Sequence, residues 1–229
     1  MAATPMTFQA LQSQAEDSRL VRKSLKLLGF YAKGDVPVPD LTTGFVDTTD
    51  RTKISIDLAV WKPFGILTPD GLERDTSVDQ EEAEGYNYAD FVRTDIIKAP
   101  KSVKVTLLQD KTRLSLEKQY GVDLSGVVST AGKGFAFDEP TLPVFPYQRL
   151  LFIDLDYFDG DQSKPIYGID LYPRAKQSDL PKVNKKKQGY PELELSFDIF
   201  TDNALGTPGR HWVDGTGYDM EQQGFGPSA

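Results

Sequence analysis

Several short segments of this sequence alternate strictly between apolar and polar residues, and this feature restricts the possible folds more than any other. In residues 191–200, PELELSFDIF, every second residue from Leu193 to Ile199 is apolar. Successive side chains of a β-strand point to opposite faces, so this segment predicts a strand with one face in a core. Similar patterns occur in residues 24–33, 51–61, 101–110, 148–158 and 165–173.

Residues 110–121, DKTRLSLEKQYG, predict the one helix that interrupts this series of strands. Asp110 is placed to cap the first turn, and Arg113 and Glu117 have the i,i+4 spacing of a helical ion pair. Gly121 is expected to end the helix, because glycine readily adopts the left-handed conformation of a helix C-terminus.

The remaining segments divide the chain into a core domain and two arms. Residues 1–18 are expected to form an N-terminal arm, 19–206 a β domain and 207–229 a glycine-rich C-terminal arm. Residues 62–89 carry few strand signals and an acidic cluster, and we expect a long irregular loop there. The predicted fold is mainly β (α+β): an antiparallel β-sandwich or partial barrel with one flanking α-helix, the long loop and extended arms.

Composition excludes several functional classes. The 229 residues carry a formal net charge of −8, which argues against tight binding to a phosphate backbone. Cysteine is absent and His211 is the only histidine, so thiol chemistry, disulfides and histidine-rich metal sites are not expected. The first 19 residues are too polar for a signal peptide, and no segment has the run of about 20 apolar residues of a membrane helix. We therefore expect folding in a cytoplasm, with no membrane contact.

The order of these features resembles a known family. Residues 61–95, WKPFGILTPDGLERDTSVDQEEAEGYNYADFVRTD, resemble the major tail protein (tail-tube protein) of long-tailed, siphovirus-type bacteriophages: an apolar strand, a Phe-Gly step, a T-x-D-G turn and an acidic, aromatic loop. Residues 101–121 are similar to that family's strand, polar turn and helix ending in an aromatic-Gly pair. The opening segment LLGFYAKGDVPVPD and the closing segments LLFIDLDYFDGD, YGIDLYPRAKQ and LELSFDIFTDNALG follow the same order.

The resemblance implies a structural virion protein without catalytic residues or cofactors. Its subunits form hexameric rings that stack into a tail tube, the conduit for DNA ejection, and are assembled in the host cytoplasm. The implied partners are other copies of the chain, a tape-measure protein in the lumen, and the tail terminator and distal tail proteins at the ends. A related tail ring component, such as a terminator or distal tail protein, is the nearest alternative.

Two groups of residues are predicted to serve this assembly. The inter-subunit contacts are expected at Phe64, Gly65, Asp70, Gly71, Tyr86 and Tyr88 in the long loop and at Trp212 in the C-terminal arm. A tube that passes DNA should not bind it, so an acidic strand face suits the lumen. The candidate lumen acids are Glu192, Glu194, Asp198, Asp154 and Asp156.

Other interpretations of single motifs are weaker. The acids around Gly160 depart from the spacing of a calcium loop and predict a solvated turn instead. His211 has no catalytic partner suggested by spacing, and Lys182 with Lys185–Lys187 is expected to be a solvated basic loop. A carbohydrate-active β-sandwich remains an alternative of another class, although neither Trp61 nor Trp212 is grouped with a carboxylate pair.

Overall fold

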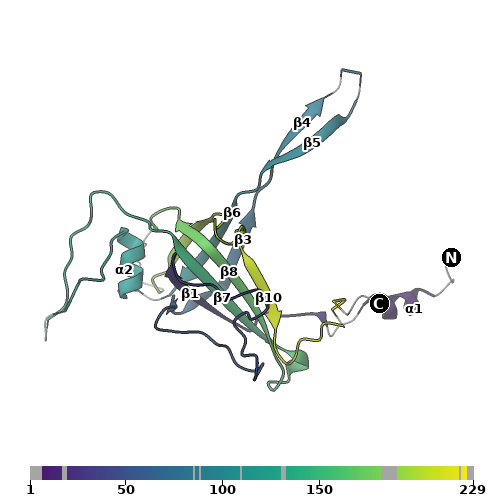
Figure 1. Ribbon diagram of the computed structural model, residues 1–229, viewed down its shortest axis with the longest axis horizontal. Coiled ribbons are helices and arrows are strands. Elements are labelled where there is room, and N and C mark those ends of the chain that lie inside the picture. Colours follow the sequence, from purple (N-terminus) through teal and green to yellow (C-terminus); the bar gives the residue numbers. More distant parts are fainter. Residues whose placement is uncertain are drawn as a thin grey trace.

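A computed structural model describes residues 7–16, 20–84, 86–87, 89–108, 110–129, 133–181, 190–221 and 223–225. The predicted mainly β, antiparallel fold is confirmed (Figure 1). The strands are β1 (Lys26–Lys33), β2 (Lys62–Pro63), β3 (Leu67–Thr76), β4 (Asp79–Glu84), β5 (Phe91–Lys98), β6 (Lys101–Leu107), β7 (Gln148–Tyr157), β8 (Pro165–Gln177), β9 (Leu193–Ile199) and β10 (Arg210–Asp214). The helices are α1 (Phe8–Ala15), α2 (Arg113–Tyr120) and the short 3-10 helix η2 (Phe158–Gly160).

One sheet of eight strands forms the body. Its order is β2-β1-β7-β8-β9-β6-β3, with β10 paired to the first half of β8, and all the pairs are antiparallel. The sheet curls so that its end strand β3 approaches β1: a Cβ on Gly71 would lie 3.6 Å from a methyl of Leu27. The body is thus a partial barrel. A separate two-stranded sheet, β4-β5, projects from it (Figure 1).

Apolar side chains pack on both faces of the sheet. The inner cluster fills the curl and includes Phe64, Phe152, Leu195 and Phe197, with Leu114 of α2 beside them. The outer cluster covers β1, β7 and β8 with residues from the segment between β1 and β2, among them Phe45 and Trp61. Burial on both faces explains why β7 is buried at each of its first six positions.

The outer faces of β6 and β9 are left open to solvent. Every second residue of β9 is buried, as the alternation predicted, and Glu194 and Asp198 on the other face are exposed. Lys104 of β6 lies on the same open face and forms a 4.0 Å ion pair with Glu73 of β3. On the outer face of the eight-stranded sheet, the half formed by β1, β7 and β8 is therefore covered by a loop, and the half formed by β9 and β6 is a free, charged surface.

The strand predicted for residues 51–61 is wrong. Aspartate side chains close turns there: the Asp50 carboxylate accepts from the backbone N–H of Thr52, and that of Asp57 accepts from Ala59. Ile54 and Ile56 pack on the outer core cluster, yet only Ile54 makes an isolated bridge, to Val46. Alternation here arises from a loop that covers a core, because turn-forming aspartates interrupt regular pairing.

Helix α2 agrees with prediction in its ion pair and its end but not in its cap. Arg113 lies 2.7 Å from Glu117, and Gly121 ends the helix with φ of 59°. The N-cap is Thr112 rather than Asp110, and its hydroxyl oxygen accepts from the backbone N–H of Ser115 at 3.1 Å. Lys111 has a positive φ of 57°, which moves the start of the helix beyond Asp110.

Candidate functional site

The β4–β5 hairpin is the most exposed regular element of the described chain. Every residue of both strands is exposed, and the two strands pair only with each other. Four large apolar residues of β5 are more than half exposed: Phe91, Val92, Ile96 and Ile97. An isolated two-stranded hairpin is only marginally stable in water. A projection with this much exposed apolar surface is typical of a segment that packs against another molecule.

The base of this hairpin is tied to the body. Strand β3 pairs with β6 up to Thr76 and Lys101, and the Ser77 N–H donates to the Pro100 carbonyl at 3.2 Å. The hairpin therefore continues the direction of β3 and β6 away from the sheet (Figure 1). Residues 62–89 were predicted to be an irregular loop, and that prediction is wrong, because they contain β2, β3 and β4.

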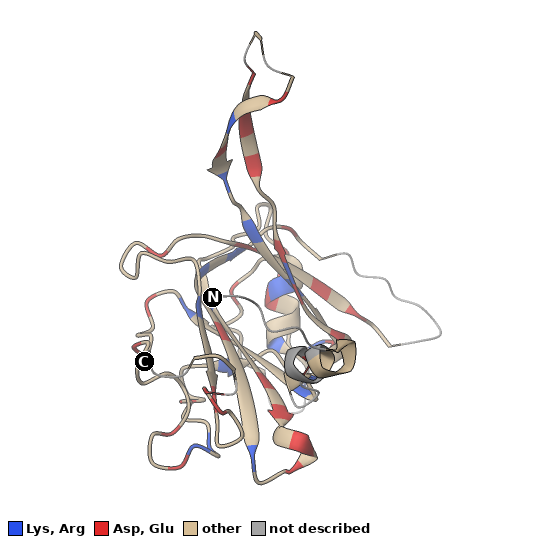
Figure 2. Cartoon of the chain, turned by 90° about the vertical axis from the view of Figure 1, so that its right-hand side faces the viewer, with Lys and Arg blue, Asp and Glu red and all other residues tan. Residues whose placement is uncertain are grey.

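Acidic residues line one strand of the hairpin. Asp79, Glu81, Glu82 and Glu84 lie on β4, and Figure 2 shows these red segments along the projection. Arg93 of β5 pairs locally with Asp95 at 2.6 Å and leaves the carboxylates of β4 to solvent. A surface complementary to this hairpin would combine apolar area with hydrogen-bond donors or positive charge.

Only some of the loop residues predicted to make inter-subunit contacts lie on the projecting hairpin. Tyr86, at its tip, is fully exposed, whereas Tyr88 lies outside the described residues. Phe64 is a core residue: its ring is 1% exposed and packs 6.1 Å from the ring centroids of both Phe152 and Phe197. The expectation of an inter-subunit contact at Phe64 is therefore wrong for a simple reason, the burial of its ring within its own chain.

Gly65, Asp70 and Gly71 shape β3 and its approach. Gly65 has φ of 100° and Gly71 has φ of 71°, a backbone region that favours glycine. Gly71 lies where the register of β3 against β6 shifts, between Leu67 and Leu72. Asp70 is exposed beside it. These residues bend β3, the strand that leads into the hairpin, so they serve the fold of the chain. They lie below the base of the hairpin rather than at its tip.

Trp212 also packs within its own chain. It lies on β10, opposite Ile169 of β8, and meets the ring of Phe45 edge to face at 5.7 Å. Its indole N–H donates to the Leu41 carbonyl at 3.0 Å. Residues 207–229 were predicted to form an arm outside the β domain, and the structure contradicts this over residues 210–214, where β10 joins the sheet.

The candidate lumen acids separate onto opposite faces of the sheet. Asp154 follows Leu150 and Phe152 along the inner face of β7, while Glu194 and Asp198 lie on the open face of β9. The Asp156 carboxylate accepts from the Lys23 backbone N–H at 3.2 Å, so the N-terminal segment crosses that end of β7. Glu192 is exposed just before β9. Of the two faces, the open face of β9 is the one that carries exposed carboxylates.

Asp154 belongs to a polar group that the sequence patterns did not reveal. Arg74 of β3 reaches across the curl to Asp170 of β8 at 3.3 Å, and His211 of β10 lies 2.5 Å from the same carboxylate. Burial and then repulsion from Asp170 raise the pKa of Asp154. The one sign of this polar group in the sequence was Asp170, an acidic residue within the alternating segment 165–173. Nothing in the sequence indicated that Arg74 of β3 and His211 of β10 would both contact Asp170.

This environment makes stability dependent on pH through Asp154. Its pKa in the folded state is raised, so its contribution to stability is present in acid and lost as pH rises through that pKa. Asp154→Asn is therefore expected to raise the melting temperature at neutral pH, with the gain vanishing near about pH 3, where the carboxyl is protonated in both states. Thermal unfolding at the two pH values checks this. Glu194→Gln, on the exposed face, is the control, and an equal gain for Asp154→Asn at both pH values would contradict the argument.

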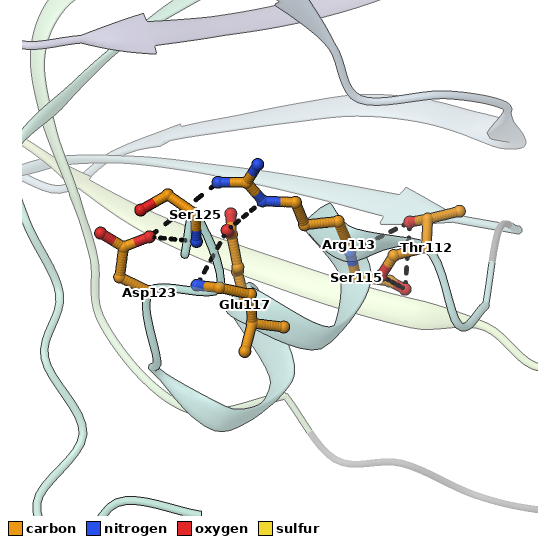
Figure 3. A network of polar contacts seen from close by, with 7 residues as sticks. Thr112, Arg113, Ser115, Glu117, Asp123 and Ser125 are labelled. Atoms are coloured by element: carbon orange, nitrogen blue, oxygen red, sulfur yellow. Dashed lines mark hydrogen bonds and ion pairs between the residues drawn. The ribbon is translucent and has the colours of Figure 1, made fainter. Parts of the chain in front are cut away.

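A groove lies beside α2. It has a volume of about 880 Å³ and lies between α2, the end of β1 and the segment leading into β7. Its rim is held by a polar network: Glu117 pairs with Arg113 and also accepts from the Leu124 N–H at 3.1 Å, and Asp123 accepts from the Ser125 N–H at 2.7 Å (Figure 3). These bonds fix the turn after the helix, which forms part of the rim of the groove.

No metal site or membrane helix is found in the described part of the chain. The described residues contain no group of three or more histidine, cysteine, aspartate or glutamate side chains arranged to hold a metal ion. None of the described helices has the length and apolar character needed to cross a membrane.

Comparison with known proteins assigns neither a family nor a function to this chain. Neither the protein-family models nor the curated proteins compared with this sequence match it. Among solved structures, a chain of the cryo-EM structure of the anti-feeding prophage (AFP) baseplate, 6-fold symmetrised, is similar with a TM-score of 0.40 and 11% sequence identity. The similarity covers 82% of this chain and 92% of that chain. At this degree, the similarity does not assign a function.

Proposed function

We propose that this chain is a structural subunit of a bacteriophage tail that assembles with copies of itself into rings and stacks them into a tube. The observation that carries the proposal is the β4–β5 hairpin, with its exposed apolar residues and free strand edges. Such a projection gains stability when another subunit covers it, by apolar burial and by pairing of its edges. The resemblance of residues 61–121 to phage major tail proteins supports the same function.

The positions of the surfaces also suit a ring. The hairpin and the α2 side lie at different places on the molecule, so any contact between them is heterologous, and repeated heterologous contacts close into rings or continue as filaments (Figure 1). We place the open face of β9, with Glu194 and Asp198, toward the lumen. Its carboxylates would repel the phosphates of passing DNA.

Electron microscopy of the purified protein over a concentration series, with light scattering beside it, tests this function. Rings or hollow tubes of uniform diameter are the expected result. A related terminator or distal tail protein would stop at single rings that do not lengthen with concentration. A particle that stays monomeric at every concentration, and also when mixed with tail initiator proteins, would contradict self-assembly and would move attention to the carbohydrate-binding alternative.

A further inference from the structure

The groove beside α2 has an apolar wall. The residues that form it come from three parts of the chain and include Val36, Val60, Leu114, Val122, Val144 and Phe145. Val144 is 70% exposed and Val60 is 39% exposed. The wall therefore offers apolar area that no described part of the same chain covers, on a surface held in place by the hydrogen bonds of the α2 network.

The floor of the groove carries a desolvated amine without a carboxylate partner and a buried amide nitrogen without an acceptor. The Lys118 amine donates to the Gln148 side-chain carbonyl at 2.5 Å and lies over the ring of Tyr31, 5.3 Å from its centroid. Burial lowers the pKa of Lys118 to about 8. No carboxylate of the described residues pairs with this amine at ion-pair distance. Gln148 is 4% exposed, and its side-chain N–H donors have no partner among the described residues.

Unpaired donors in a buried position are costly, and an acceptor that enters the groove removes the cost. A buried polar group without a partner destabilises a protein far more than an exposed one does. The acceptor that suits both a lysine amine and an amide N–H is a carboxylate, which accepts several hydrogen bonds and carries the opposite charge. The occupant of this groove should therefore present a carboxylate next to an apolar or aromatic group.

The tip of the β4–β5 hairpin has these two features. Glu84 ends β4 with an exposed carboxylate, and Tyr86, two residues on, exposes its whole ring. Within one molecule the hairpin projects from the far end of β3 and β6, while α2 lies on the other side of the body (Figure 1). The tip that fits the groove therefore belongs to another molecule.

We propose that the groove beside α2 receives the hairpin tip of a second copy of this chain, with the Glu84 carboxylate on Lys118 and Gln148 and the Tyr86 ring against the apolar wall. This inference rests on the proposed self-assembly and specifies its contact. Each pair of neighbouring molecules would form one such contact. Every unfinished assembly would then keep one free hairpin and one free groove, which is the condition for continued growth.

Cross-linking between two single-cysteine variants tests the contact directly, because the natural chain has no cysteine. Asn87→Cys lies at the hairpin tip next to Tyr86, and Ser125→Cys lies at the rim of the groove. A mixture of the two variants with a short bismaleimide is expected to give a covalent heterodimer, identified by mass spectrometry. Ser163→Cys, in the exposed turn between β7 and β8, replaces Ser125→Cys in the control and should give none.

Charge removal at the tip supplies the second measurement. Glu84→Gln is expected to raise the concentration at which assembly begins by about tenfold, because it removes the charged partner of a desolvated amine. Asp79→Asn, at the base of the same strand, removes an equal charge and should leave that concentration nearly unchanged. Equal effects of the two variants would show a general charge effect and overturn the Lys118 contact.

The two measurements separate the contact from the function. If tubes form and the Asn87–Ser125 cross-link is absent, the groove assignment is wrong and the tube function stands. If the cross-link forms specifically but microscopy shows only dimers or short chains, the contact is right and the tube function is wrong. If a concentrated mixture shows neither assembly nor the cross-link, both are overturned.

Discussion

A variant in which an Asn-Gly turn replaces residues 78–99 is expected to fold normally and to lose assembly completely. The new turn would join Ser77 to Pro100, which already face each other through a 3.2 Å backbone hydrogen bond. Strands β3 and β6 pair as far as Thr76 and Lys101, so a two-residue hairpin turn continues their geometry. The removed residues are exposed throughout β4 and β5 and contribute nothing to either core cluster.

Thermal unfolding tests whether this variant folds normally, and electron microscopy tests whether it still assembles. The melting temperature should change by no more than about 2 °C, since surface changes away from packed sites have small effects. Microscopy should show no rings or tubes at any concentration that assembles the natural chain. A milder variant, Ile96→Ser with Ile97→Ser, keeps the hairpin and its charge and should weaken assembly without abolishing it. Normal tubes from the deletion variant would refute the role of the hairpin.

Phe64→Ala is expected to destabilise the fold by about 3–5 kcal/mol, the usual cost of removing a buried aromatic ring. The ring is 1% exposed and stacks nearly parallel to Phe152, with an interplanar angle of 8°. A loss of this size is a large fraction of the stability of a typical domain. Any loss of assembly by this variant would therefore follow from unfolding.

Urea denaturation followed by circular dichroism measures the effect, with Phe91→Ala as the matched control. Phe91 is the same residue type on the hairpin, 52% exposed, and its removal should change the free energy of unfolding by less than about 0.5 kcal/mol. The buried Phe64 is thus expected to stabilise the fold, whereas Phe91 is expected to serve the proposed contact between subunits. A Phe64→Ala variant with the natural midpoint but no assembly would place Phe64 in the interface after all.

The burial of Phe64 also changes which deletion is informative. Removing the whole segment from Phe64 to Tyr88, which contains the predicted loop contacts, would take away Phe64 and all of β3. Since β3 closes the curl of the sheet, that variant should fail to fold and would report nothing about assembly. The shorter deletion within the hairpin avoids this problem.

Local patterns were sufficient where the stabilising interactions are themselves local or face a core on one side. The alternation of β6 and β9 matches their observed burial residue by residue, because the period of a strand fixes which side chains reach the core. The pair Arg113–Glu117 and the end of α2 at Gly121 depend on spacing within one or two turns and were predicted correctly. These features require no knowledge of the rest of the chain.

Tertiary structure decided everything that depends on which distant segments meet. The apolar alternation of Ile54 and Ile56 does not distinguish a strand from a loop that covers a core. The exposed strand β4 has no apolar face for a pattern to reveal, and β10 becomes a strand only because the first half of β8 offers it a free edge.

The same reason explains the outcome for the candidate site. The sequence by itself determined a mainly β chain with a helix near residues 110–121, acidic strand faces and an aromatic, acidic segment near residue 86. Only the tertiary structure decided that Phe64 packs in the inner core cluster and Trp212 against the outer one, that Asp154 and Glu194 lie on opposite faces, and that Lys118 lies in a groove with Gln148. A side chain's spacing shows which neighbours along the chain share its face, whereas its burial depends on strands paired from far away in the sequence.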